Sequence, residues 1–284
     1  MSEPIGVPRW VREIEPGRAL RHAEASFGGT RGMNARDFAD TVRNAYDTVF
    51  SQLDEEGHHP VRFWNFLPGI HDVMEEDRSR YMLFNAARHA SFETRFARAA
   101  DFSQAIPTAS AVGVDDDLFS LHCLGAAEAG VSVENPRQIP AYLYSQEYGP
   151  KPPCFARATA LAVSFPAPTL LVAGTSSITG ERSRHEGDLP HQFLETIRNL
   201  AHLVAHAGGR LLPEGQPLTT INALLRAFRD IRVYYVNRAD EPLIRQLVGV
   251  HFPHAARVEY ARVSLCRPEL LVEIEGLAEP STAQ

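Results

Sequence analysis

The sequence lacks the features that mark several classes of protein. It contains no block rich in Lys or Arg, and 28 basic against 35 acidic residues give a net charge of −7. Nucleic acid is therefore not an expected partner. No apolar run reaches the roughly twenty residues of a membrane-spanning helix, and no basic-then-apolar leader pattern follows Met1. We expect a cytoplasmic protein with no membrane partner.

Cysteine is scarce, and the candidate metal-ligand motifs are incomplete. Cys123, Cys154 and Cys266 are widely separated and form no CxxC pair, so neither a disulfide framework nor a zinc knuckle is expected. His202 and His206 stand four residues apart on an expected helix, but no HExxH motif or third ligand accompanies them. The sequence predicts no metal site.

The 284 residues, 44% of them hydrophobic, suit a globular α+β protein. Apolar residues at helical spacing predict helices over 34–57, 75–96, 189–207 and 241–250. Runs of β-branched and aromatic residues predict strands over 61–66, 110–114, 119–124, 155–165, 169–176, 231–236, 257–265 and 270–274. The acidic turn Asp115–Asp117 predicts that the strands on either side of it form a hairpin.

The two halves of the chain repeat one order of elements: long helix, strand, second helix, strand, strand. We interpret this as two copies of one unit, a β-sheet with two helices on one face, with the last two strands of each unit paired as a hairpin. The predicted boundaries are an N-terminal unit over 1–135, a connector rich in Pro and Tyr over 136–154, and a C-terminal unit over 155–284. His122 takes the place in the first unit that Glu273 takes in the second.

Two carboxylates interrupt the apolar strand near the C-terminus. Glu273 and Glu275 lie two residues apart, so both point to the same face of that strand. One explanation is an edge strand whose acidic face meets water. The other is a carboxyl group in a partly dry pocket, where desolvation raises its pKa and makes it a proton donor near neutral pH.

Several segments carry a resemblance to a known family. The second half resembles the Rid/YjgF fold. The whole chain resembles the chorismatases, through RFWNFLPGIHD from Arg62, YMLFNAARHASF from Tyr81, YGPKPPCFARAT from Tyr148, VAGTSSITGE and LCRPELLVEIEG. The resemblance implies two fused Rid/YjgF-like, chorismate mutase-like units, chorismate as the small-molecule substrate, and loss of its enolpyruvyl group as pyruvate. This chemistry needs no cofactor, and none is expected.

The resemblance also implies roles for particular residues. Glu273, in VEIEG, matches the catalytic glutamate as general acid. Glu275 also faces inward and is the competing assignment, or a further candidate for substrate contact, and two carboxylates so close raise the pKa of one of them. Arg157 and Arg267 are expected to hold the substrate carboxylates. Further candidates for substrate contact are Tyr144, Tyr148, Gly174, Thr175 and Cys266.

The sequence leaves open which product is formed and which class of function the protein has. Gly174 and Cys266 resemble the branch that forms 3-hydroxybenzoate, because small residues there let the ring hydroxyl, in place of water, reach the cationic ether carbon. The alternatives are a chorismate hydrolase that forms a dihydroxycyclohexadiene carboxylate, a Rid-type imine deaminase, and a non-catalytic binding or scaffold protein. The oligomeric state, monomer or homo-oligomer, stays open.

Overall fold

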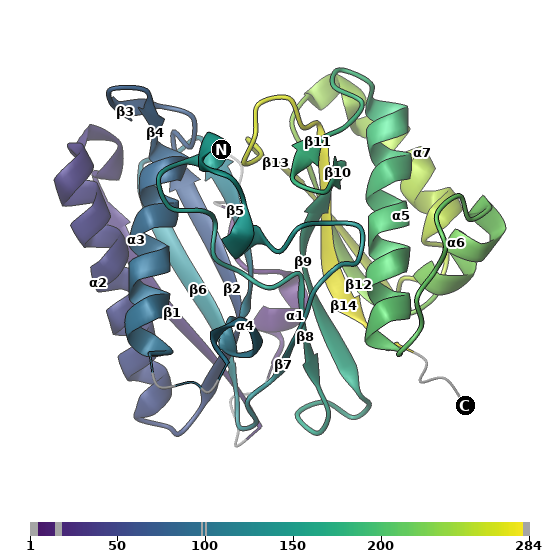
Figure 1. Cartoon of the computed structure of the whole chain (residues 1–284), viewed down its shortest axis with the longest axis horizontal. Coiled ribbons are helices and arrows are strands. Elements are labelled where there is room, and N and C mark those ends of the chain that lie inside the picture. Colours follow the sequence, from purple (N-terminus) through teal and green to yellow (C-terminus); the bar gives the residue numbers. More distant parts are fainter. Residues whose placement is uncertain (1–4, 15–18, 98, 100, 281–284) are drawn as a thin grey trace.

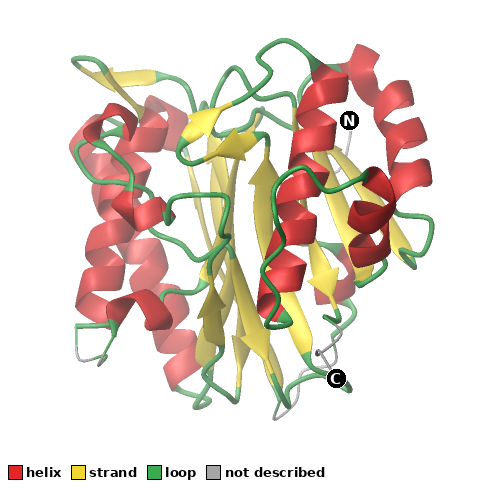
Figure 2. Cartoon of the chain, turned by 45° about the vertical axis from the view of Figure 1, so that its right-hand side comes forward, coloured by secondary structure: helices red, strands yellow, loops and turns green. Residues whose placement is uncertain are grey.

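Two β-sheets face each other in the middle of the molecule, and helices cover the outer face of each sheet (Figures 1 and 2). The computed structural model describes residues 5–14, 19–97, 99 and 101–280. On the outer face of the first sheet lie α2 (Ala35–Asp54) and α3 (Arg80–Arg95). The second sheet is covered by α5 (Leu189–Ala207), α6 (Leu218–Leu225) and α7 (Glu241–His251). The predicted α+β class with helices on one face of each sheet is confirmed.

The two units have the same strand order. The first sheet runs β1-β6-β2-β5, formed by β1 (Leu20–Gly28), β6 (Leu118–Ala126), β2 (His59–Pro68) and β5 (Thr108–Val114). In the second sheet β9-β14-β12-β13 take the same places, formed by β9 (Thr169–Ser176), β14 (Val272–Ala278), β12 (Phe228–Tyr235) and β13 (Arg257–Arg262). Two further strands, β8 (Ala158–Leu161) and β7 (Val131–Val133), extend the second sheet beyond β9.

The backbone register supports the predicted match between the halves. His122 is paired with Trp64 in the first unit, and Glu273 is paired with Tyr234 in the second. Trp64 and Tyr234 occupy equivalent positions of β2 and β12. His122 and Glu273 therefore stand at corresponding sites of the two sheets.

The predicted hairpins are wrong in both halves. β5 and β6 follow each other across the Asp115–Asp117 turn, but β2 lies between them, parallel to β5 and antiparallel to β6. In the second unit β12 separates β13 from β14 in the same way. The chain therefore crosses over one strand at each of these connections, and the central strand gains partners on both edges.

Several predicted boundaries also differ from the structure. The helix expected from residue 75 begins at Arg80, because the short pair β3 (Val73–Glu75) and β4 (Arg78–Ser79) precedes it and the Ser79 hydroxyl caps the amide of Met82. α6 was not predicted. β1 lies in the N-terminal segment that carried no assignment, and β7 joins the second sheet ahead of residue 136. The remaining short elements are α1 (Arg9–Arg12), α4 (Phe102–Ala105), β10 (Ile178–Thr179), β11 (Arg182–Ser183) and the 3-10 turns η1 (Thr30–Gly32), η2 (Ala141–Leu143), η3 (Gln146–Tyr148) and η4 (Arg238–Asp240).

The layers create three hydrophobic cores, one between each sheet and its helices and one between the two sheets. On β14 the side chains alternate, so that Val272 and Ile274 pack under the helices while Glu273 and Glu275 face the opposite sheet. β14 is an interior strand, between β12 and β9. The edge-strand explanation of the two carboxylates is therefore wrong, and both are buried between the sheets.

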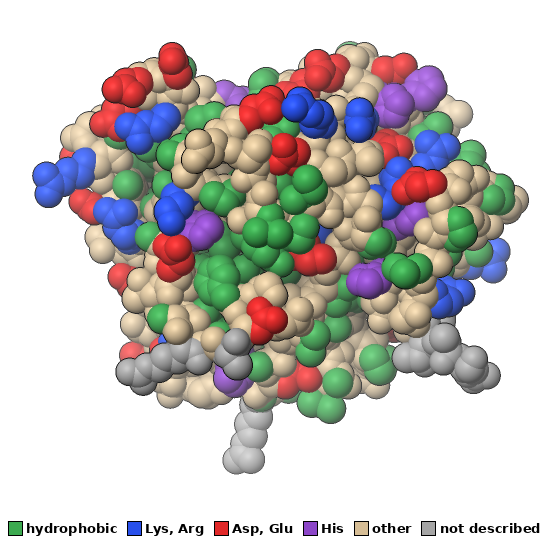
Figure 3. Space-filling view, viewed as in Figure 1, with side chains coloured by type: hydrophobic (Ala, Val, Ile, Leu, Met, Phe, Trp, Pro, Cys, Tyr) green, Lys and Arg blue, Asp and Glu red, His purple; other side chains and the backbone are tan. Residues whose placement is uncertain are grey.

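Residues 136–154 cross in front of the two sheets with only the 3-10 turns η2 and η3 as regular structure (Figure 1). Hydrophobic side chains gather near the middle of this face of the molecule (Figure 3). None of the helices in the described part of the chain combines the length and the apolar character that a membrane crossing requires.

Candidate active site

A cavity of about 400 Å³ lies between the two units. The first unit contributes α3 and β5 to its wall, and the second contributes β9, β14 and the turn before β14. The connector contributes Tyr144 and Tyr148. The side chains used below come from Tyr81, Arg88, Ser110, Tyr144, Tyr148, Arg157, Gly174, Ser176, Cys266, Arg267 and Glu273.

Glu273 is the buried acid of this cavity. Its side chain is 5% exposed, and the Ser176 hydroxyl on the neighbouring strand donates to its Oε2 at 3.1 Å. Burial, and after it the nearby charge of Glu275, raise the pKa of Glu273 to about 7. A substantial fraction of Glu273 is therefore protonated at neutral pH.

Gly174 leaves the space that the Glu273 carboxyl group occupies. A β-carbon built on Gly174 would lie 2.0 Å from Oε1 of Glu273 and 2.5 Å from its carboxyl carbon. Real β-carbons do not approach other atoms this closely, so any other residue at position 174 displaces the acid. The Gly174 amide is itself fixed by donation to the Ser110 hydroxyl at 2.8 Å.

Glu275 is held in a separate network and does not line the cavity. Its Oε2 accepts from Arg62 and from Ser110, each at 2.7 Å. Its Oε1 accepts from the Trp64 indole at 2.9 Å and from the Tyr234 hydroxyl at 3.0 Å. Glu275 thus accepts four hydrogen bonds and forms an ion pair with Arg62. These contacts hold the two sheets together, and the charge of Glu275 raises the pKa of Glu273 from outside the cavity.

Three buried arginines face the cavity. Arg157 donates to the Tyr144 hydroxyl at 2.6 Å and has Glu134 as a distant carboxylate partner, 4.0 Å from its Nε. Arg267 donates to the Glu181 carbonyl at 2.8 Å and lies 4.0 Å above the Tyr148 ring. The third is Arg88, described next.

Arg88 was not among the predicted site residues. It is 1% exposed, lies between the rings of Phe84 and Phe155, and donates to the Asn85 side chain at 2.9 Å. Within the described residues, neither Arg88 nor Arg267 has a carboxylate within 4.0 Å. The sequence did carry a signal for Arg88, since it is a charged residue on the apolar face of α3.

The other predicted residues divide between the cavity and its surroundings. Tyr144 and Tyr148 lie side by side in its wall, with ring centroids 5.3 Å apart. Cys266 also lines the cavity, and burial raises the pKa of its thiol to about 12, so that the thiol stays neutral. Thr175 points away from the cavity, and its hydroxyl donates to the carbonyl of Ala173. Ser110 and Ser176 were not predicted from the sequence. Ser176 meets Glu273 because β9 pairs with β14, and Ser110 meets Gly174 because the two sheets pack face to face.

The site can hold an anionic ligand and deliver one proton to it. Buried guanidinium groups without carboxylate partners favour a ligand that brings its own carboxylates. A neutral carboxyl group at the same wall is a general acid at neutral pH. A ligand with more than one carboxylate and a group that accepts a proton on reaction fits this arrangement.

Comparison with known proteins identifies the family. The model for the N-terminal part of FkbO/Hyg5-like chorismatases matches residues 15–125. A 3-hydroxybenzoate synthase of Streptomyces hygroscopicus is 35% identical over 245 residues, which are 84% of this chain and 69% of that protein. A chorismatase of Streptomyces rapamycinicus is 28% identical over 257 residues, 88% of this chain and 73% of that protein. A chorismatase crystal structure superimposes with a TM-score of 0.77 at 25% identity, covering 92% of this chain and 75% of the other. The chain belongs to the chorismatase family.

Proposed function

We propose that this protein cleaves the enolpyruvyl ether of chorismate and releases pyruvate and 3-hydroxybenzoate. The observation that carries the proposal is the placement of Glu273, a buried carboxyl group with a pKa of about 7, in one cavity with three buried arginines. The family relationship, including the relative named as a 3-hydroxybenzoate synthase, supports the same substrate.

The arginines match the charge of chorismate, which carries two carboxylates at neutral pH. Arg88 and Arg267 are the best candidates to bind them, because each is buried and lacks a carboxylate partner among the described residues. A planar guanidinium binds a carboxylate through two parallel hydrogen bonds, which orients the ligand as well as holding it. Arg157, fixed by Tyr144 at 2.6 Å, adds positive potential at the same wall.

Glu273 supplies the proton. Its carboxyl hydrogen passes to the methylene carbon of the enol ether, which becomes the methyl group of pyruvate. The ether carbon becomes cationic, and the carboxylate left on Glu273 stabilises that charge in a site of low dielectric. The 4-hydroxyl oxygen bonds to this carbon, and its proton returns to Glu273. The ring C4–O bond then breaks as the C3 proton passes to that oxygen, which makes the ring aromatic. The resulting hemiketal breaks its bond to the C3 oxygen, which takes the hydroxyl proton and becomes the phenol, while the 4-oxygen becomes the carbonyl of pyruvate. The two products together contain the atoms of one chorismate, so no water is consumed.

The choice of 3-hydroxybenzoate as the ring product rests on Gly174 and Cys266. Both are small residues of the cavity wall, and they leave room for the ring to place its own 4-hydroxyl, in place of water, near the cationic carbon. Gly174 has a second role, because its missing side chain also admits the acid.

The test is incubation of purified protein with chorismate, with pyruvate followed by a coupled lactate dehydrogenase assay and the ring products separated by chromatography. We expect equal amounts of pyruvate and 3-hydroxybenzoate. A dihydroxycyclohexadiene carboxylate in place of 3-hydroxybenzoate would keep the acid step and overturn the branch. Absence of pyruvate would overturn the proposed function.

Variants separate catalysis from folding. Glu273→Gln keeps the size of the side chain but removes the acid, so we expect turnover to fall by about 100-fold or more. Thermal stabilisation by bound chorismate should remain. Glu195→Gln is the matched control, because Glu195 is also buried but lies on α5, outside the cavity and paired with Arg137. We expect Glu195→Gln to lower the melting temperature and to leave the rate of turnover unchanged.

A further inference from the structure

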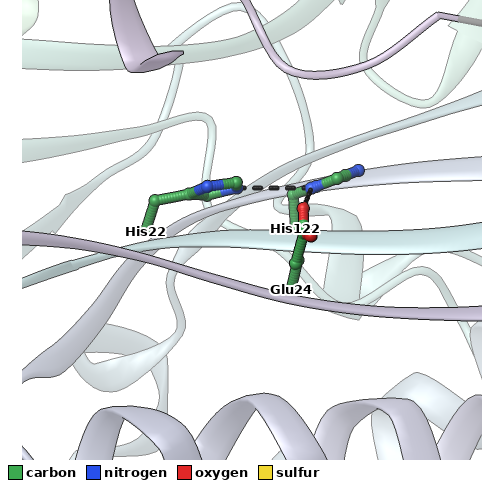
Figure 4. Close-up of side chains that lie close together, drawn as sticks. All are labelled: His22, Glu24 and His122. Atoms are coloured by element: carbon green, nitrogen blue, oxygen red, sulfur yellow. Dashed lines mark hydrogen bonds and ion pairs between the residues drawn. The ribbon is translucent and has the colours of Figure 1, made fainter. Parts of the chain in front are cut away.

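Three metal-ligating side chains meet on the first sheet, at the place that corresponds to the acid of the second. His22 and Glu24 come from β1 and His122 comes from β6 (Figure 4). Glu24 and His122 are directly paired in the strand register, as Ser176 and Glu273 are in the second unit. Residues 22 and 24 share one face of β1 because side chains alternate along a strand.

The donor atoms are spaced as ligands of one small cation are. His22 Nε2 lies 3.2 Å from His122 Nδ1, and His122 Nδ1 lies 3.1 Å from Glu24 Oε2. The three ligand atoms all lie within 4.8 Å of one another. Zinc binds nitrogen and oxygen at about 2.0–2.1 Å in a tetrahedral shell, which puts neighbouring ligand atoms about 3.3 Å apart. Two of the three separations, 3.2 and 3.1 Å, are close to that value.

Hydrogen bonding between these side chains cannot join all three of them at once. Nδ1 of His122 faces both the second imidazole and the carboxylate, and a ring nitrogen carries at most one hydrogen. If that hydrogen points to Glu24, the two ring nitrogens share no normal hydrogen bond. If it is absent, a lone pair faces the carboxylate. A cation between the three atoms would satisfy all of them at once.

One side of the cluster is open to solvent, and the two arginines near it are already paired with carboxylates. The Glu24 side chain is 62% exposed, whereas that of His122 is 11% exposed, so the site has a buried side and an open side. Arg21 is paired with Glu56 at 2.9 Å and Arg232 with Glu259 at 2.6 Å. The carboxylate of Glu24 is therefore the charge directly available to a bound cation.

We propose that His22, Glu24 and His122 form a binding site for one divalent transition-metal ion, with Zn²⁺ as the best match. Two imidazoles and one carboxylate are a ligand set that zinc accepts, with water or another small ligand in the fourth position. The ion would link β1 to β6 and so fasten the edge strand of the first sheet. The site lies on β1 and β6, away from the strands that carry Glu273 and Gly174.

Calorimetric titration with ZnCl₂ tests the proposal, using the full chain with no histidine tag. We expect one Zn²⁺ per chain, and at least tenfold weaker binding in His22→Ala and in Glu24→Gln. Both positions are partly or largely exposed, so these variants are expected to fold. His191→Ala is the matched control, because His191 forms a histidine–carboxylate pair with Asp188 on the surface and lies outside the cluster. Equal Zn²⁺ binding by wild type, His22→Ala and Glu24→Gln would overturn the proposal.

A second readout concerns stability. An ion that binds the folded state raises the melting temperature by mass action. Zn²⁺ should therefore raise the melting temperature of wild type and of His191→Ala, and raise that of His22→Ala much less. Equal increases in all three would mean that zinc binds elsewhere. Neither measurement uses chorismate, so failure of this proposal and failure of the proposed function are distinguishable.

Discussion

The carboxyl group of Glu273 occupies the space that a side chain on Gly174 would fill, since a β-carbon there would lie 2.0 Å from its Oε1. The two residues come from neighbouring antiparallel strands, β9 and β14. The absence of a side chain at one position is thus a requirement for the acid at the other.

The variant Gly174→Ala tests this relationship. The added methyl group must displace the Glu273 carboxyl, and a shift of about 1 Å at a reacting group costs on the order of 100-fold in rate. We expect kcat to fall by about that factor, as measured by pyruvate release. Thr175→Ala is the neighbouring control, because its side chain points away from the cavity. Full activity in Gly174→Ala would show that the carboxyl does not work from its observed position.

The raised pKa of Glu273 predicts how activity depends on pH. In the proposed mechanism Glu273 reacts in its protonated form, and its pKa in the folded protein is about 7. We therefore expect kcat/KM to be constant on the acid side and to fall about tenfold per pH unit above pH 7. A pH–rate profile from pH 5 to 9 measures this, with wild-type folding checked by circular dichroism at each pH. A profile that rises with pH through 7 would assign the carboxyl a role as base.

The same shift predicts a cost in stability. An acid whose folded pKa is raised keeps its proton in the folded state, so unfolding releases a proton and stability falls as pH rises from the ordinary value of 4.5 to about 7. Glu273→Gln removes this effect. At pH 8 we expect the variant to be more stable than wild type by up to about 3 kcal/mol.

Urea unfolding at pH 5 and pH 8 measures the difference. The two proteins should be nearly equal in stability at pH 5 and should diverge at pH 8. Lower stability of the variant at both values would mean that the buried carboxyl is held by stronger interactions than the single hydrogen bond from Ser176.

Arg88, whose place in the cavity no sequence motif predicts, offers a test of substrate binding. Arg88→Met keeps an unbranched side chain between Phe84 and Phe155 and removes the charge. Loss of a charged hydrogen-bond donor to the ligand costs about 1.5–3 kcal/mol, so we expect KM for chorismate to rise roughly 10- to 100-fold. Steady-state kinetics measure KM, and the melting temperature serves as the folding control. An unchanged KM would exclude Arg88 from ligand binding.

Local patterns predicted much of this structure. Helix α5 runs over Leu189–Ala207, as its apolar spacing predicts, and the structure adds that the Asp188 side chain caps its first turn. The repeat of helix and strand predicted the two units. Pairing between the strands was less accessible: the turn signal at Asp115–Asp117 is a local preference, and it carried no information about the distant strand β2 that lies between β5 and β6.

The site residues divide in the same way into those that the local sequence predicts and those that distant segments bring to the cavity. Seven predicted residues line one cavity: Tyr144, Tyr148, Arg157, Gly174, Cys266, Arg267 and Glu273. Thr175 does not, and the alternation of side chains along β9 explains why, since Gly174 and Ser176 point the other way. Arg88 and Ser110 reach the cavity from the first unit, and Arg62 engages Glu275 across the two sheets. Contacts between units so far apart in sequence have no local pattern.

The matched register of His122 and Glu273 has a consequence for how the two units share the site. Two units of identical strand order could each present an acid on the shared face, as a symmetric dimer would. Here the second unit provides the carboxyl group, and the first provides Arg88 and Ser110 on the opposite wall. The two halves are thus complementary where a duplicated pair would be equivalent, and the cavity takes its wall from both of them.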